Sequence, residues 1–373
     1  MFDILQKLLF LRKATKDHIQ TILEKEKFVY TQETIDGLLK GNQKGVRYGN
    51  VVLEREENGV WRKRFFKVVI DGTLRTYRLF RRQVEITDAL HKDKHNTFPN
   101  IAVIAHSFET PVPYAIFETR EQGETFGFMH DSSAFYETFK EDDMNRLVEA
   151  IYSFHKAGQT FDVSIWKYTR PISSSLTFYI HEAHELLTTK IKHKTKDGVF
   201  VENTVDEILS KTFALEHVEK HVAEIFTREW QKVIASQAER KNYLVHADMQ
   251  IDNVYRHPDN TFELIDFEWV GKSDNPVVAI MYDYGNLRAR AWSSPNFQAL
   301  LDTAMLEHGV KHYDASIVKS GITLGKLRSS LMMSRFHLDY HNTVKKDKRT
   351  EEDYNAMYPK TLSSLESVLR NSA

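Results

Sequence analysis

Cysteine is missing from this chain of 373 residues. A chain without cysteine has no disulfide framework, no thiolate metal site and no cysteine nucleophile, which fits a reducing cytoplasm. The 51 basic and 52 acidic residues nearly cancel, so the bulk charge predicts neither a nucleic-acid nor a membrane-surface partner. No apolar run reaches the roughly 18 residues that would span a membrane, and no signal peptide is recognisable. We therefore expect a cytoplasmic protein with two domains or one large bilobal unit.

One segment, residues 243–269, has the pattern of a reaction site. His246, Asp248 and Asn253 follow a short apolar run, and a second apolar run ends at Asp266. Phosphoryl transfer from ATP needs a group that orients the attacking hydroxyl, and it needs oxygen ligands for the magnesium ion on the phosphates. A His-x-Asp loop, an Asn five residues after the Asp, and an Asp on the next hairpin supply these parts in the usual order. The pattern predicts a phosphotransferase that uses ATP and Mg²⁺.

The spacing suggests a role for each side chain. Asp248 is expected to accept a hydrogen bond from the acceptor hydroxyl and to align it with the γ-phosphate. Asn253 and Asp266 are predicted magnesium ligands, because a strand, a turn and a second strand over residues 253–267 would return Asp266 to the side of Asn253. His246 is expected to brace the loop through a backbone or carboxylate contact.

These residues resemble the aminoglycoside phosphotransferase and choline kinase family, which are small-molecule kinases with a protein-kinase-like fold. The third motif reads Asp266-Phe267-Glu268 where protein kinases have Asp-Phe-Gly, and no Arg follows His246. Both differences favour the small-molecule kinases over the protein kinases. The resemblance extends over residues 35–373 and implies transfer of the γ-phosphate of ATP to a hydroxyl of an aminoglycoside-like, choline-like or sugar-like compound.

The resemblance implies an α+β, bilobal protein-kinase-like fold, and the pattern of apolar residues agrees with it. We predict a small β-rich nucleotide-binding lobe over residues 1–120, with a helical extension over residues 1–38. A larger, mainly helical catalytic lobe then covers residues 121–373, with the boundary at residues 119–123. Beyond Gly123, helical patterns are interrupted only in the catalytic region. The expected elements of the small lobe are strands at 46–55 and 60–70 joined through Asn58-Gly59, a helix at 78–91, and strands at 101–108 and 114–118.

The small lobe offers a lysine for the nucleotide. Lys67 lies on an expected strand with apolar neighbours, from which it would reach the α- and β-phosphates as a point charge; the family also has a strand lysine before a helix. The position of the family's helix glutamate falls at Gln83, and Glu85 lies two residues further on. Residues two apart do not share a helix face, so only one of them contacts Lys67. We predict Glu85, because it carries the charge.

Other assignments follow from the resemblance. Glu118 and Thr119 are expected to border the adenine of ATP, and Asp283 is expected to support the catalytic loop. Glu268 is expected to line the substrate site or to approach the metal through a water molecule. A glycine-containing loop at residues 41–45, or alternatively at 48–50, would cover the phosphates.

The acceptor is less well defined by the sequence. An amine-bearing acceptor would suit carboxylates and aromatic faces, such as the acidic run at residues 141–143 and the indoles of Trp269 and Trp292. Acidic runs are usually solvated, however, and tryptophans are usually in the core. His181 and His184 have helical spacing but lack the His-Glu-x-x-His order of zinc proteases, so we interpret them as a polar helix face.

Two alternatives to a small-molecule kinase stay open. A non-catalytic pseudokinase that acts as a binding or scaffold protein is kept open by the unclear helix glutamate, while the intact Asp248, Asn253, Asp266 and Lys67 argue against it. A protein kinase is disfavoured by the residue after Phe267, which is not Gly, and by the absence of a recognisable Ala-Pro-Glu motif.

Overall fold

The chain forms two compact units. The computed structural model describes residues 11–40, 47–92, 102–119, 124–125, 136, 139–157, 159, 169–195, 197–235, 241–257, 259–292, 294–346 and 349–371. The described residues within Met1–Thr125, Thr160–Arg170 and Val254–Val270 form the first unit. Those within Phe126–Gln159, Pro171–Asn253 and Gly271–Ala373 form the second. Each unit is described separately below.

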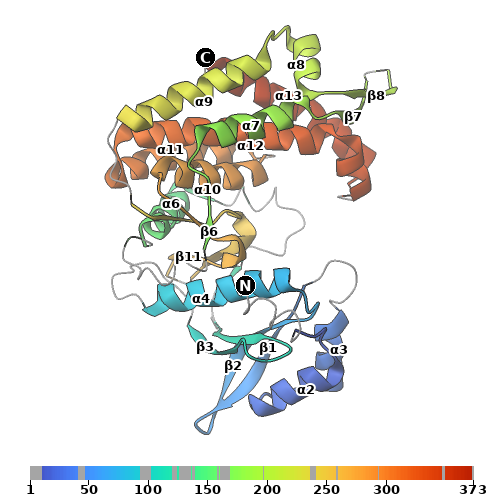
Figure 1. Cartoon of the computed structure of the whole chain (residues 1–373), viewed down its shortest axis with the longest axis vertical. Coiled ribbons are helices and arrows are strands. Elements are labelled where there is room, and N and C mark those ends of the chain that lie inside the picture. The colour runs from blue at the N-terminus through green and yellow to red at the C-terminus, as the bar shows by residue number, and fades with distance from the viewer. Residues whose placement is uncertain are drawn as a thin grey trace. The chain divides into compact units, whose positions relative to one another are not determined.

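The first unit combines an antiparallel sheet with three helices (Figure 1). Its helical elements are α2 (Lys16–Lys25), α3 (Gln32–Lys40), α4 (Leu74–Lys92) and the 3-10 turn η3 (Phe267–Trp269). Its strands are β1 (Tyr48–Glu57), β2 (Val60–Val69), β3 (Val103–Ser107), β4 (Tyr114–Glu118), β5 (Glu124–Thr125), β10 (Val254–Arg256) and β11 (Phe262–Leu264). The larger sheet has the order β1-β2-β4-β3, and a smaller one has the order β11-β10-β5.

The β1–β2 hairpin sets the register of the larger sheet. Its turn is Asn58-Gly59, with φ angles of 53° and 81°, which Asn and Gly adopt more readily than other residues. Successive side chains of a strand point to opposite faces of the sheet. Strand β2 therefore contributes to two different cores.

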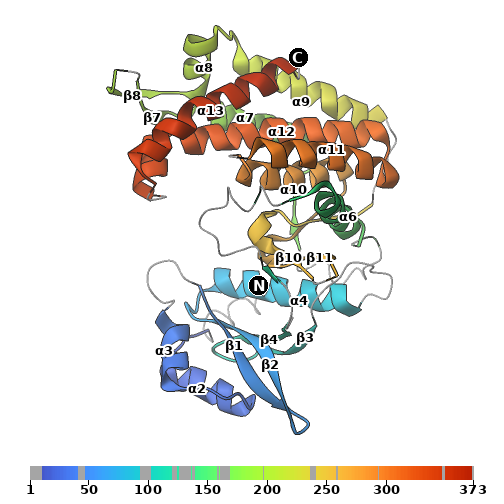
Figure 2. The ribbon, with the colours of Figure 1, turned by 180° about the vertical axis from the view of Figure 1, so that it is seen from behind.

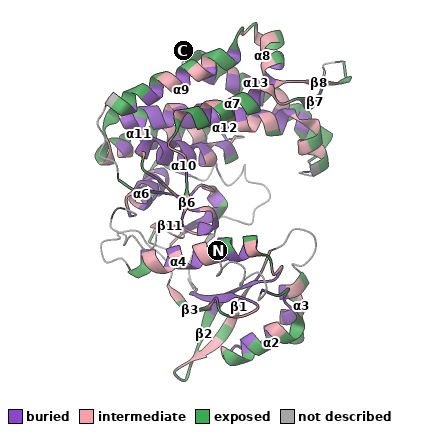
Figure 3. Ribbon diagram, viewed as in Figure 1, coloured by how far each residue is buried: buried purple, intermediate pink, exposed green. Residues whose placement is uncertain are grey.

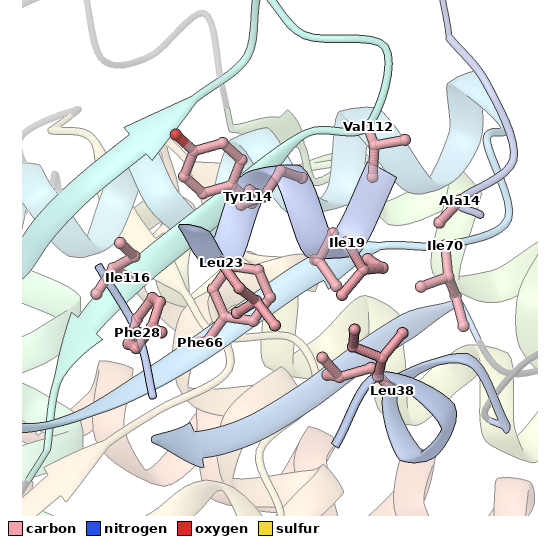
Figure 4. Close-up of a cluster of buried hydrophobic side chains, with 13 residues drawn as sticks. Ala14, Ile19, Leu23, Phe28, Leu38, Phe66, Ile70, Val112, Tyr114 and Ile116 are labelled. Carbon is pink, nitrogen blue, oxygen red and sulfur yellow. The ribbon is translucent and has the colours of Figure 1, made fainter. Parts of the chain in front are cut away.

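One face of the sheet is covered by α2 and α3, which lie next to β1 and β2 in both views (Figures 1 and 2). Phe66 and Val68 of β2 and Ile116 of β4 are completely buried there, together with Ile19 and Leu23 of α2 (Figure 4). The apolar residues of α2 recur at helical spacing, so the helix places one apolar side on the sheet.

The opposite face of the sheet packs against α4. Val69 and Phe117 meet Phe80 and Val84 of this helix in a second buried cluster. Lys67 alternates with Phe66 and Val68, so its side chain lies on the α4 face, where the residue is only 5% exposed. The pleat of the strand thus directs a lysine into an apolar layer.

The second unit is mainly helical. Its helices are α6 (Glu141–Ala157), α7 (Leu176–Thr188), α8 (Val205–Phe213), α9 (Val218–Ala235), α10 (Pro276–Arg290), α11 (Pro295–His312), α12 (Ala315–Leu338) and α13 (Glu351–Asn371), with short helical turns η2 (Ile251–Asn253) and η4 (His341–Lys346). Its strands are β7 (Ile191–Lys194), β8 (Phe200–Asn203), β9 (Tyr243–Val245) and β12 (Gly271–Ser273), while β6 (Arg170–Pro171) has one residue in each unit. None of the helices within the described residues is both long enough and apolar enough to cross a membrane.

Helix α10 is fixed by close packing against α12. Most of α10 is buried (Figure 3), and glycines allow the two helices to approach. A Cβ on Gly325 would lie 2.5 Å from Cδ1 of Tyr284, and one on Gly321 would lie 2.7 Å from Ile280. A Cβ on Gly285 would lie 3.0 Å from the carbonyl oxygen of Gly325. A longer side chain at these positions would therefore push α10 away.

The predicted α+β class is confirmed, and so are the hairpin joined by Asn58-Gly59, the strand at 114–118 and the helix after β2. That helix begins at Leu74, four residues before the prediction. The strand expected at 101–108 is β3, which contains a register shift between Val103 and Ala105. The predicted lobe boundary at residues 119–123 lies largely outside the described residues and stays a prediction.

The helical extension predicted over residues 1–38 is helical within its described part, as α2 and α3. The two helices are separated where Lys27 takes a φ of 58° and Phe28 pairs with Arg55 of β1. One expectation of local structure needs correction. The β7–β8 hairpin of the second unit was not expected from the helical patterns beyond Gly123. Its turn contains Gly198 with a φ of 80°, a signal of the kind that predicts a hairpin.

We predict that Gly325→Ala lowers the stability of the protein by about 1–3 kcal/mol, because the new methyl group overlaps the buried ring of Tyr284. Calorimetric unfolding measures this loss. The matched control is Gly37→Ala in α3, where a Cβ meets nothing within 4 Å and where alanine favours the helix by up to about 1 kcal/mol. Equal transition temperatures for Gly325→Ala and the parent protein would contradict the close contact of α10 with α12.

Candidate active site

Lys67 lies at the centre of a polar cluster in the first unit. Its Nζ donates to Oε1 of Gln83 at 2.5 Å and to Oε1 of Glu268 at 2.8 Å. Oδ1 of Asp266 lies 3.6 Å from the same nitrogen, and the centre of the Tyr48 ring lies 4.2 Å from it. Lys67, Gln83 and Glu268 are all buried. A buried ammonium group needs an opposite charge and hydrogen-bond acceptors, and this cluster provides both.

The helix residue at Lys67 is Gln83, which corrects the prediction of Glu85. Residues on an α-helix are 100° apart, so Gln83 lies next to Val84 and one turn after Phe80, on the face toward the sheet. Glu85 lies further around the helix and pairs with Arg81, with Oε1 3.4 Å from Nε. The carboxylate that neutralises Lys67 comes from η3 instead of α4.

Glu268 is itself held by two arginines that the sequence analysis did not identify. Nη1 of Arg47 lies 3.7 Å from its Oε2, and Nη1 of Arg82 donates to its carbonyl oxygen at 2.9 Å. The next residue, Trp269, has its ring 5.6 Å from the guanidinium carbon of Arg170. The one sequence signal was the position of Arg82 beside Gln83 on the expected helix, because arginine is well suited to binding phosphate groups.

Asp266 combines an unusual backbone conformation with a carboxylate oxygen that has no hydrogen bond within the described residues. Its φ of 64° and ψ of 59° are in the left-handed region, which Asp tolerates better than most residues. Its Oδ1 is buried and has no hydrogen-bond partner among the described residues, and Nη1 of Arg47 is in the same condition. One orphaned acceptor with a negative charge suits a cation, and one orphaned donor with a positive charge suits an anion.

The ring of Tyr48 forms an uncharged side of the cluster around Lys67. Burial raises the pKa of its phenol above the ordinary value, and the nearby Glu268 carboxylate acts in the same direction. The ring therefore stays uncharged and contacts Lys67 through its π face. Burial, followed by the charge of Arg170, lowers the pKa of the Arg82 guanidinium.

In the second unit, a buried carboxylate holds the loop after β9. Asp283 of α10 is completely buried. Its Oδ2 accepts a hydrogen bond from the backbone nitrogen of His246 at 2.9 Å, and its Oδ1 accepts one from Ala247 at 2.8 Å. Nε2 of His155, in the last turn of α6, lies 3.0 Å from the same Oδ2. Asp283 therefore joins α6, α10 and the loop.

This loop contains backbone strain. Ala247 has a φ of 64°, which costs a residue with a Cβ of order 1 kcal/mol or more and persists only where neighbours hold it. The two hydrogen bonds to Asp283 provide that restraint. The His246 ring is buried, with its centre 6.0 Å from that of Phe154. His246 thus braces the loop through its backbone nitrogen and its ring packing.

Asp248 and Asn253 lie on either side of a short turn. Nδ2 of Asn253 donates to the backbone carbonyl of Asp248 at 2.8 Å, which leaves the amide oxygen as the group that can bind a cation. Asp248 is partly exposed. The predicted hairpin after Asn253 is present, since Val254 of β10 pairs with Leu264 of β11.

The residues predicted to border the nucleotide have contacts within the first unit. The backbone nitrogen of Glu118 donates to Ala102 at 2.9 Å, and Oγ1 of Thr119 donates to the carbonyl of Lys63 at 2.7 Å. Their role at adenine stays a prediction. The glycine-containing loop at 41–45 lies outside the described residues, and residues 48–50, the alternative, belong to strand β1.

The acidic run and Trp292, considered for an amine-bearing acceptor, and His181, considered for zinc, all lie in the second unit. Residues 141–143 form the first turn of α6, where acidic side chains interact favourably with the helix dipole. The ring of Trp292 lies 4.8 Å from that of His337 and 5.9 Å from the guanidinium of Arg349. His181 lies on α7 and pairs with Glu185 at 3.6 Å. Within the described residues, no group of three or more His, Asp and Glu side chains could hold a metal by itself.

Comparison with known proteins identifies the fold. Neither a family model nor a curated protein matches the sequence. An aminoglycoside phosphotransferase from Alicyclobacillus acidocaldarius is 11% identical with a TM-score of 0.51, covering 86% of this chain and 89% of that one. An ethanolamine kinase from Plasmodium vivax (11% identity, TM-score 0.47, 99% of both chains) and a choline kinase from Streptococcus pneumoniae (14%, 0.45, 93% of this chain and 97% of that one) are also similar. The first of these, with a TM-score above 0.5, shows that the chain has the kinase-like α+β fold that the sequence motifs predicted.

We predict that Asp283→Asn lowers stability by about 2–4 kcal/mol, because an amide cannot accept from both backbone nitrogens and His155 at once and leaves a buried donor unsatisfied. Chemical denaturation measures the loss. Asp142→Asn, on the exposed first turn of α6, is the isosteric control and should change stability by about 0.5 kcal/mol or less. A small effect for both variants would show that the loop after β9 does not depend on Asp283.

Proposed function

We propose that this protein transfers the γ-phosphate of ATP to a hydroxyl group of a small molecule. The observation that carries the proposal is the buried strand lysine, Lys67, 3.6 Å from Asp266 at the start of the Asp-Phe-Glu segment. A lysine that reaches phosphates and an aspartate that binds their metal ion are the two nucleotide-binding parts that phosphotransferases of this fold require.

The charge of the first unit suits a triphosphate. Lys67 contacts the carboxylates of Asp266 and Glu268, and Arg47 contacts that of Glu268. Arg82 donates to the carbonyl oxygen of Glu268, and the guanidinium of Arg170 lies against the ring of Trp269. In this group of six charged side chains the four cations outnumber the two carboxylates, which favours a polyanion. Arg47, whose Nη1 has no hydrogen-bond partner among the described residues, is a candidate for a phosphate oxygen.

The donor set also suits Mg²⁺. This ion prefers oxygen ligands, and it is usually bound by one or two protein groups together with phosphates and waters. The orphaned Oδ1 of Asp266 and the amide oxygen of Asn253 are groups of this kind. A bound Mg²⁺ would neutralise charge on the phosphates during transfer.

Asp248 would orient the acceptor. In the proposed reaction its carboxylate accepts a hydrogen bond from the acceptor hydroxyl, whose oxygen attacks the γ-phosphorus in line with the leaving ADP. The new oxygen–phosphorus bond forms as the bond to the β–γ bridging oxygen breaks, and the hydroxyl proton passes toward Asp248. The hydrogen bonds of Asp283 would keep the preceding backbone, and thus Asp248, in a fixed position.

The acceptor class is proposed from the fold and from the motif. The structural neighbours are named as aminoglycoside, choline and ethanolamine kinases, and each of these compounds carries a hydroxyl group and an amine or quaternary ammonium group. We propose a hydroxyl compound of that size, with amine-bearing and neutral sugar-like compounds as separate arms of an acceptor screen.

A second candidate function is nucleotide binding without transfer. The neutral Gln83 at the position of the family's helix glutamate favours it. Tight ATP binding together with no ADP formation over the whole acceptor panel would support this scaffold function over the kinase.

We predict that Asp248→Ala lowers turnover by about 10²–10⁴-fold while the affinity for ATP stays near that of the parent protein. Coupled ADP release with the best acceptor of the screen measures turnover, and calorimetry measures affinity. Asp259→Ala, in the exposed turn of the β10–β11 hairpin, is the control and should keep normal turnover. A near-normal rate for Asp248→Ala would remove the role given to that residue.

We predict that Asp266→Ala weakens ATP binding in the presence of Mg²⁺, by at least about tenfold, and has little effect when EDTA is present. The physical reason is that the lost oxygen acts through the metal ion. Titration calorimetry with and without EDTA separates the two conditions. An equal loss in both would indicate that Asp266 acts on the fold or on Lys67 rather than on the metal.

A further inference from the structure

We propose that Glu268 is the residue that positions Lys67 for the nucleotide, in place of a carboxylate on helix α4. This inference deepens the proposed function and rests on it. It assigns to the third residue of the Asp-Phe-Glu segment a task that a helix glutamate would otherwise perform.

The hydrogen bonds of Lys67 support this assignment. An ammonium group has three donors and no acceptor. One donor goes to Gln83 and one to Glu268, and Oδ1 of Asp266 lies beyond hydrogen-bond distance of the same nitrogen, at 3.6 Å. The two bonded acceptors fix the direction of the side chain and leave one hydrogen for a phosphate oxygen.

The charge balance points to Glu268 rather than to its neighbours. Gln83 is neutral, so it orients the ammonium group without compensating its charge. The side chain of Asp266 is 38% exposed and its oxygen is more distant, whereas that of Glu268 is 7% exposed and in direct contact. Removing one member of a buried ion pair leaves the other charge uncompensated, so Lys67 depends on Glu268.

Glu268 is well placed for a positioning role because its own surroundings are fixed. Phe267, the preceding residue, is 1% exposed, and Arg82 of α4 binds the carbonyl oxygen of Glu268. Arg47 lies against its second carboxylate oxygen. Both oxygens of Glu268 therefore face protein cations, which argues against direct binding of a metal ion by this side chain.

The arrangement has a functional consequence. Asp266 and Glu268 are separated by one residue, so a single short turn, η3, carries both the proposed metal ligand and the partner of Lys67. The backbone of residues 266–268 therefore links the proposed metal ligand to the partner of Lys67. A carboxylate on α4 is not needed to pair with this lysine.

Moving the carboxylate from η3 to α4 tests this proposal. Glu268→Gln should lower kcat/KM for ATP by at least about tenfold. Adding Gln83→Glu to that variant returns a carboxylate to Lys67 and should recover most of the loss. Glu54→Gln, an exposed change on β1, is the control and should leave kcat/KM unchanged. The variant that carries both Glu268→Gln and Gln83→Glu also tests the proposal if Glu268→Gln alone does not fold. In that case we expect Gln83→Glu to restore folding.

Two outcomes would overturn the proposal. If Gln83→Glu restores neither ATP affinity nor stability to Glu268→Gln, then Glu268 does not act through Lys67. If excess Mg²⁺ restores Glu268→Gln while Gln83→Glu does not, then Glu268 acts on the metal ion.

A second readout separates this inference from the proposed function. The transition temperatures of Lys67→Met, Glu268→Gln and the double variant need neither nucleotide nor acceptor. A double variant that loses less than the sum of the single changes supports the pair, even if the parent protein binds no ATP and the kinase proposal fails. Additive losses would contradict the pair itself.

Discussion

The first unit depends on the burial of one ammonium group. The alternation of β2 places Lys67 on the same face of the sheet as Val69, against α4, where a charge without partners would strongly oppose folding. Two side chains accept hydrogen bonds from this ammonium group: Gln83 from the helix and Glu268 from a turn about two hundred residues later in the chain. Satisfying one buried charge therefore joins the sheet, α4 and η3, and it also produces a lysine with a fixed direction and one hydrogen left for a ligand.

The second unit uses the opposite charge in a similar way. The carboxylate of Asp283 is buried on α10, and its oxygens form hydrogen bonds with two backbone nitrogens of a strained loop and with the ring of His155. Helix α10 is in turn located by glycine contacts with α12. Rigid packing far from the loop thus determines where the backbone before Asp248 lies. In each unit, a buried charge holds the neighbouring polar groups in fixed positions. The proposed phosphoryl transfer requires polar groups that are fixed in this way.

Local patterns in the sequence predicted much of this architecture. Asn58-Gly59 predicted the hairpin, the apolar neighbours of Lys67 predicted its strand, and the motif residues predicted a kinase-like fold. The partner of Lys67 was not predictable in the same way, because helix spacing alone could not decide between Gln83 and Glu85. The choice depends on which side of α4 faces the sheet, and the charge came from a residue distant in sequence. Arg47 and Arg82 were missed for the same reason, since only tertiary contacts bring them to Glu268.

The proposed phosphoryl transfer requires a divalent ion on the phosphates of the nucleotide, with Asp266 and Asn253 as its proposed ligands. A crystal structure with a non-hydrolysable ATP analogue and Mn²⁺ tests this assignment, because Mn²⁺ is located by its anomalous scattering. We expect a manganese peak bonded to Oδ1 of Asp266, to the amide oxygen of Asn253 and to phosphate oxygens, with Lys67 on the α- or β-phosphate. A nucleotide bound elsewhere, or a metal ion that contacts neither side chain, would rule out the proposed site.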